Sequence, residues 1–80
     1  MSIKRSILQS VHGGYFLVDT STLPSGEYET IVVKSDAYGK VKDWSFTLDV
    51  KVSPTEQEAL QEHENLCSIW QEKTLFFSNI

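Results

Sequence analysis

The clearest pattern along the chain is an alternation of large apolar and polar residues between positions 41 and 52. Successive side chains of a strand point to opposite faces, so this period of two predicts a β-strand with one buried and one solvated face. A sheet built from such strands is typically antiparallel. The side chains expected to face the core are Trp44, Phe46, Leu48, Val50 and Val52.

Three further strands are expected before this one. Residues 27–34 are rich in β-branched and aromatic side chains, and they should pair with 41–52 across a loop of about four to six residues. Residues 7–11 and 15–18 flank Gly13-Gly14, which favours a tight hairpin turn. Pro24 and Gly26 predict the turn between the two hairpins.

A helix is predicted over residues 54–72. Ser53 is the expected N-cap, with Pro54 at the first helical position and Glu56 placed to complete a capping box. Apolar and half-polar residues then recur at helical spacing, which indicates one face packed on the sheet. The sequence therefore predicts one α+β domain over residues 1–80: an antiparallel sheet of about four strands in two hairpins, followed by a helix packed on one face. That helical face contains Ala59, Leu60, His63, Leu66, Cys67 and Trp70.

The net charge of −4 is unevenly distributed. Residues 1–52 carry six basic and six acidic side chains, whereas residues 53–80 carry five acids and Lys73. An acidic chain repels phosphate backbones, so direct nucleic-acid binding is disfavoured and a basic protein partner is favoured. The acids of the predicted helix, Glu58, Glu62 and Glu64 above all, form a candidate docking surface, and Tyr38 is a candidate aromatic contact.

The remaining features point to a small cytoplasmic protein. Cys67 is the only cysteine, which favours a reducing compartment, and no apolar run is long enough for a signal-peptide core or a membrane span. A chain this short gains only marginal stability from one core, so a second copy is a common remedy. Leu75, Phe76 and Phe77 form an apolar tail that suits a homodimer contact.

His63 and Cys67 are the residues with the most chemical potential. They lie four apart on one helical face, as two metal ligands or a nucleophile with its base would. A structural zinc site needs four ligands, and no further paired motif is present. We therefore expect both side chains to line the helix–sheet interface, with no catalytic residue, metal or cofactor; a small hydrolase using Cys67 and His63 is the remaining enzymatic alternative.

Three motifs follow one another across the predicted hairpin and helix: Tyr28-Glu29-Thr30-Ile31-Val32-Val33, then Gly39, Val41 and Asp43-Trp44, then Thr55, Glu58-Ala59 and His63-Glu64. They resemble a family of small bacteriophage and prophage proteins whose pattern is roughly YETMVF, GxVxDW and TxxEAxxGHE. This chain differs from it by Ile31, Val33 and Glu62, where the pattern has Met, Phe and Gly.

The resemblance implies a phage-encoded protein in the cytoplasm of a host bacterium, with no enzymatic activity. The hypothesis it favours is an accessory protein, similar in role to an anti-CRISPR, that inhibits a host defence protein such as a nucleic-acid-binding nuclease through the acidic surface. A second hypothesis is a homo-oligomer that binds a small nucleotide signal and sequesters it.

Overall fold

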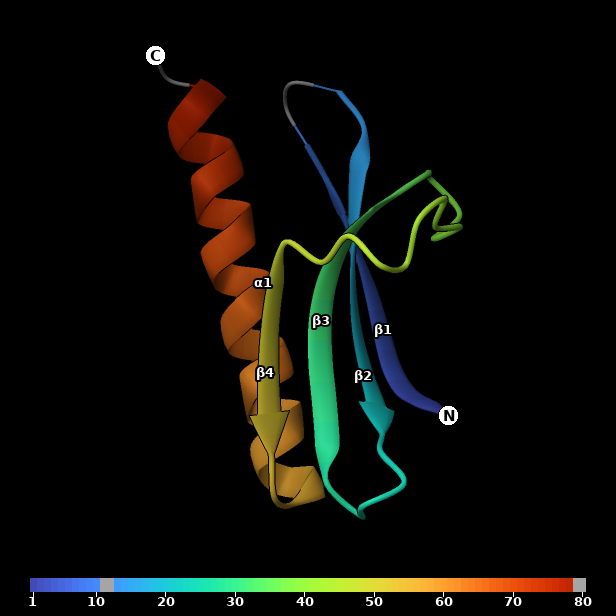
Figure 1. Cartoon of the computed structure of the whole chain (residues 1–80). Helices are drawn as coiled ribbons and strands as arrows, with labels where there is room; N and C mark the ends of the chain where they lie inside the picture. The colour runs from blue at the N-terminus through green and yellow to red at the C-terminus, as the bar shows by residue number, and fades with distance from the viewer. Residues whose placement is uncertain (11–12, 79–80) are drawn as a thin grey trace.

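Four antiparallel strands and one helix make up the fold in the computed structural model, which describes the backbone of residues 1–10 and 13–78 and the side chains of 1–10 and 13–71. The strands are β1 (Ser2–Gln9), β2 (Tyr15–Thr22), β3 (Tyr28–Ser35) and β4 (Asp49–Ser53), and the helix is α1 (Glu56–Ser78). The sheet order follows the chain, β1-β2-β3-β4, with α1 against one face (Figure 1). The predicted α+β architecture is therefore confirmed.

The turns at both ends of β2 form where the glycines allow them. Gly13 and Gly14 have φ of 95° and 83°, a region that residues with a Cβ rarely enter. At the other end, Leu23 N–H donates to the carbonyl of Glu27 at 2.8 Å, which closes the turn through Pro24 and Gly26. Both turns lie where the sequence predicts them, although β1 and β2 extend further than residues 7–11 and 15–18.

The main core lies between the sheet and α1. Val18 of β2, Val32 of β3 and Leu66 of α1 are almost completely buried against one another. Ala59 and His63 are also buried, so the predicted apolar face of the helix is confirmed. Half-buried side chains close the margins of this core: Leu8, Phe16, Leu48, Cys67 and Trp70.

The helix begins two residues later than predicted. Glu58 N–H donates to Thr55 Oγ1 at 3.2 Å, and Ala59 N–H donates to the Thr55 carbonyl at 3.0 Å. Thr55 is therefore the N-cap, with Glu58 at the third helical position. The prediction of Ser53 as N-cap was wrong because Ser53 is the buried last residue of β4.

The predicted strand 41–52 is the main error at the level of elements. Residues 36–48 form a long connection instead of a short hairpin loop, and only Asp49–Ser53 is a strand. Asp43 is one physical reason, because its Oδ1 accepts the N–H of Ser45 at 3.0 Å and its carbonyl accepts the N–H of Phe46. An Asp side chain that bonds to nearby N–H groups competes with a sheet ladder.

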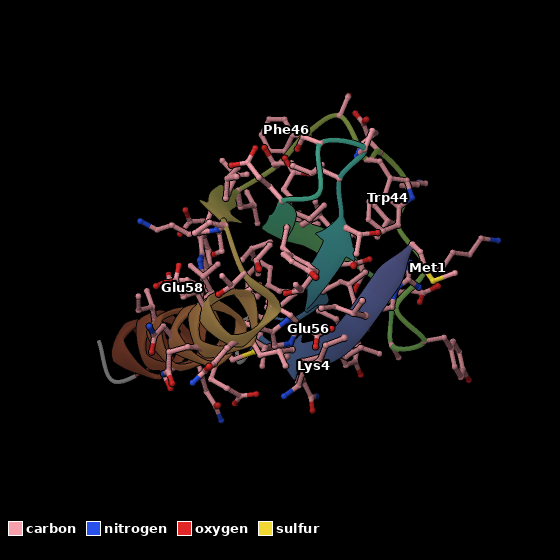
Figure 2. The ribbon with its side chains drawn as sticks, turned by 90° about the horizontal axis from the view of Figure 1, so that it is seen from below. Met1, Lys4, Trp44, Phe46, Glu56 and Glu58 are labelled. Atoms are coloured by element: carbon pink, nitrogen blue, oxygen red, sulfur yellow. The ribbon has the colours of Figure 1, made fainter. Side chains whose placement is uncertain are left out.

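The face assigned to this strand was also wrong, except for Leu48. Within β4 it is Asp49 whose side chain reaches the helix, accepting the N–H of the Trp70 indole at 3.2 Å. Because side chains alternate along a strand, Val50 and Val52 point to the opposite face of the sheet. Trp44 and Phe46 also lie on the side away from α1 (Figure 2).

The connection of residues 36–48 covers part of that second face, which we call the outer face. Leu17 and Val33 point away from the helix, since their neighbours Val18 and Val32 face it, and both are fully buried. Gly39 fits closely here, because a Cβ at this position would lie 3.2 Å from Ile7 Cδ1. The sheet is thus packed on both faces.

Candidate functional site

A chain of polar side chains runs through the helix–sheet core. His63 is fully buried, and its Nδ1 lies 2.8 Å from Thr20 Oγ1 while its Nε2 lies 2.8 Å from Ser6 Oγ. Thr20 Oγ1 also lies 2.7 Å from Thr30 Oγ1. Neutral imidazole has one donor and one acceptor, so the hydroxyls can satisfy both ring nitrogens with all hydrogen bonds directed one way along the chain.

The environment of His63 and Cys67 favours the uncharged forms of both. Burial is the main cause that lowers the pKa of His63, and the charge of Lys4 acts in the same direction. Burial also raises the pKa of the Cys67 thiol, against a smaller opposite effect of the hydrogen bond from Ser6. A thiol held protonated is a poor nucleophile, and the imidazole next to it already has hydroxyl partners on both nitrogens. The expected placement of both residues at the helix–sheet interface is confirmed.

The predicted acidic residues lie on two different flanks of α1. Glu58 and Glu62, one helical turn apart, line a pocket with Lys51 of β4. Glu64 lies on the other flank, where it forms an ion pair with Lys4 of β1 that lowers the pKa of the carboxyl group. The structure therefore brings together two of the three acids, and places Glu64 with a basic partner of its own.

Tyr38 lies in the connection 36–48 and is 91% exposed. Asp36 shapes its turn, because Asp36 Oδ1 accepts the N–H groups of Tyr38 at 2.8 Å and Lys40 at 2.9 Å. These two hydrogen bonds, that from Lys40 first, lower the pKa of Asp36. Tyr38 is thus held on an ordered turn with its ring free for contact.

Next to this turn is a pocket of about 480 Å³ with a basic lining. Three lysines, Lys34, Lys40 and Lys42, surround it, and among the described residues of the lining Asp36 is the one acid. Lys40 and Lys42 are neighbours in the connection, and the path of the chain after β3 places them around the same pocket as Lys34 of β3. The sequence reasoning missed this pocket, since the short hairpin it predicted places residues 40 and 42 differently.

Four exposed apolar side chains from residues 44–52 define a second feature that was not predicted from the sequence. Trp44, Phe46, Val50 and Val52 are 45%, 63%, 47% and 55% exposed, and we call these four the outer surface. Arg5 of β1 lies over the Trp44 ring, 5.7 Å from its centroid, so the surface crosses the outer face from β1 to β4. The alternation of residues 44–52 is the sequence signal for this surface, and the prediction that these four side chains are buried is wrong.

Arg5 connects the outer surface to a buried carboxylate. Asp19 is 3% exposed and accepts hydrogen bonds from Arg5 Nε, Ser2 Oγ and Ser21 Oγ, each at 3.0 Å. A buried carboxylate needs such partners, and Arg5 supplies the compensating charge. This network orients the guanidinium group against the face of the Trp44 ring.

Among the described side chains, no group of three or more His, Cys, Asp or Glu residues could hold a metal ion. Within that same part of the chain, α1 is not long and apolar enough to cross a membrane. The predicted dimer contact of Leu75, Phe76 and Phe77 lies outside the residues whose side chains are described.

Comparisons with protein-family models, with curated proteins and with solved structures give no match to this chain. The resemblance to small phage proteins, and the host location it implies, therefore stay predictions.

Proposed function

We propose that this protein is a non-catalytic binding module that docks on a protein partner through the outer surface. The observation that supports this is the exposure of four large apolar side chains on a sheet face whose other part is closely packed. Exposed apolar side chains gathered on one face of a small domain are characteristic of interaction sites. The face covered by α1, in contrast, holds the core of Val18, Val32 and Leu66.

The composition of the outer surface suits a protein partner. Trp44 and Phe46 are aromatic anchors of the kind that contribute most of the energy at interfaces, and Arg5 adds a charged rim group. The Asp43 turn fixes the backbone between the two rings, which reduces the entropy lost on binding.

The acidic pair Glu58 and Glu62 fits this proposal in a secondary role. Both lie beside Val52 and Lys51 in one pocket, so they adjoin the β4 end of the outer surface. Charges at the rim of an interface affect the association rate and the specificity for a partner more than they affect the affinity. A basic host protein, such as a nucleic-acid-binding defence nuclease inhibited by a phage accessory protein, is the partner that the sequence resemblance favours.

The test is a quantitative pull-down from bacterial lysate with matched variants. We expect Trp44→Ser combined with Phe46→Ser to lose the specific partner, and Glu58→Lys combined with Glu62→Lys to slow its association. Ile69→Ser is the control, because Ile69 is also an exposed apolar residue, 44% accessible, but lies on the helix. Equal recovery by the first double variant and the wild type would remove the outer surface from the proposal.

The basic pocket supports a second candidate function, the binding of a small anionic ligand such as a nucleotide signal. Three lysines around about 480 Å³ provide charge and space for a phosphate group with an attached ring. A ligand that binds only the folded state adds about 2.7 kcal/mol to the free energy of unfolding when its free concentration is about a hundred times its dissociation constant.

Thermal melts with inorganic phosphate, cyclic mononucleotides and cyclic dinucleotides test this candidate. A rise in melting temperature should disappear in a variant with Lys34, Lys40 and Lys42 all changed to Gln. Lys51→Gln is the control, since Lys51 lies at the other pocket. No rise with any of these probes counts against a nucleotide ligand.

A further inference from the structure

We propose that two copies of this chain pair antiparallel along their β4 strands, with the twofold axis at Val50, to form one continuous eight-stranded sheet. The proposal depends on the backbone edge of β4 and on the charges of Asp49 and Lys51. It does not depend on the outer surface binding a partner, so either proposal can fail while the other holds.

The first observation is an unpaired strand edge. Among the residues whose backbone is described, β4 is the last strand of the sheet and has β3 as its neighbour. Val50 N–H donates to the carboxylate of the preceding residue, Asp49, at 2.9 Å. Residues of an antiparallel strand turn their backbone groups alternately to either side, so Val50 and Val52 present theirs at the open edge. Such an edge is a template for another strand.

The second observation is that the β4 sequence is complementary to itself. When Val50 of one copy lies opposite Val50 of the other, Asp49 of each copy lies opposite Lys51 of its partner. Two Asp–Lys ion pairs then lie one on each side of the axis. They occupy the positions where the side chains of an antiparallel pair approach most closely. An axis at Lys51 would instead oppose two lysines, which is unfavourable.

The side chain of Asp49 is already held at this edge. Its Oδ2 accepts the indole N–H of Trp70, and its Oδ1 accepts the N–H of Val50. On pairing, the Val50 N–H would transfer to the Val50 carbonyl of the second copy. Asp49 Oδ1 would then be released to accept from Lys51 across the axis, while Oδ2 keeps its bond to Trp70.

The opposite edge of the sheet does not offer this match. β1 carries Lys4 and Arg5 next to each other, and its register with β2 shifts between Ser2 and Lys4. Pairing two β1 strands would gather four cations, and an irregular edge resists regular pairing. The open edge with complementary charges is therefore β4, and its occupant is a second copy of β4.

Sedimentation velocity over a series of protein concentrations tests the proposal. We expect the wild type to approach twice the mass of one chain, and Lys51→Asp to raise the dimer dissociation constant about tenfold or more, because two ion pairs become repulsive together. The swap Asp49→Lys with Lys51→Asp should recover the dimer. Lys42→Asp is the matched control, since it changes the net charge equally at an exposed position of the loop.

Val50→Pro provides an independent test of the backbone contact. Proline removes the edge N–H, which β3 does not use, so circular dichroism should show a folded protein that sediments as a monomer. Phe46→Ser should sediment as the wild type does. A wild type of single-chain mass at every concentration would overturn the proposal, as would a dimer that neither Lys51→Asp nor Val50→Pro weakens. A folded charge-swap variant that stays monomeric would exclude the register at Val50.

Discussion

Thr20 is the residue on which the buried polar chain depends. Its hydroxyl lies between His63 Nδ1 and Thr30 Oγ1, so Thr20→Val leaves two buried groups short of a partner while conserving volume. We expect Thr20→Val to lower the free energy of unfolding by about 2–4 kcal/mol. Thr30→Val should lower it by about 1 kcal/mol, because Thr30 is the last side chain in the row of hydrogen bonds. Urea unfolding of both variants measures the difference, and equal losses would contradict the central role of Thr20.

His63 should make stability depend on pH in a defined direction. Its pKa in the folded state lies below the ordinary value of 6.5 because burial opposes the charged form. Well above pH 6.5 the imidazole is neutral in both the folded and the unfolded state, so its titration does not reduce the free energy of unfolding. At lower pH the unfolded state binds more protons at this ring than the folded state, so stability falls with falling pH. Urea unfolding from pH 7.5 to 5 should show this decline, and His63→Gln should reduce the slope. Unchanged slopes would assign the decline to other groups.

At the level of elements, the connection 36–48 is held to the sheet by close packing at Gly39. This residue has φ of 79° and lies against Ile7, whereas Gly26 has φ of 90° with open space around it. Either change to Ala should cost about 1–2 kcal/mol of stability, because Ala disfavours the left-handed backbone conformation. Only Gly39→Ala also forces a neighbouring side chain to move. Thermal unfolding should therefore show the larger loss for Gly39→Ala. Equal losses would mean that the connection adapts without resistance.

The start of α1 allows a second comparison at this scale. Thr55→Ala should destabilise the protein by about 1 kcal/mol, because the N–H of Glu58 loses its cap. Thr47→Ala, at an exposed position of the connection, is the control and should change stability little. Chemical denaturation measures both, and no loss for Thr55→Ala would show that the cap does not stabilise the helix.

The elements that local rules govern could be predicted from the sequence. Gly13-Gly14 and Pro24 defined the turns, and the spacing of Ala59, His63 and Leu66 defined the buried side of the helix. The alternation of residues 44–52 gave the wrong result because residues 44–48 do not form a strand and because a period of two does not say which face of a strand is buried. The decisive interactions were Asp43 with its own turn and Asp49 with Trp70. The second of these is a long-range contact, 21 residues apart, that no local pattern contains.

The same limit applies to the candidate sites. Glu58, Glu62 and Glu64 are close in sequence, yet the helix turns Glu64 towards Lys4 of the first strand. Lys34, Lys40 and Lys42 gather only because the connection returns over the end of the sheet. Surface sites depend on tertiary placement, which the spacing of residues along the sequence does not contain.

At the scale of the whole molecule, the sheet has buried residues on both faces, whereas the four side chains of the outer surface remain exposed. Phe46→Ser should therefore change the free energy of unfolding by less than about 1 kcal/mol, since its ring is already largely exposed. Leu66→Ala, in the core between sheet and helix, should cost about 2–5 kcal/mol. Urea unfolding at one protein concentration measures both. If Phe46→Ser cost as much as Leu66→Ala, the ring would belong to a core, and the outer surface would have to be reassigned from binding to folding.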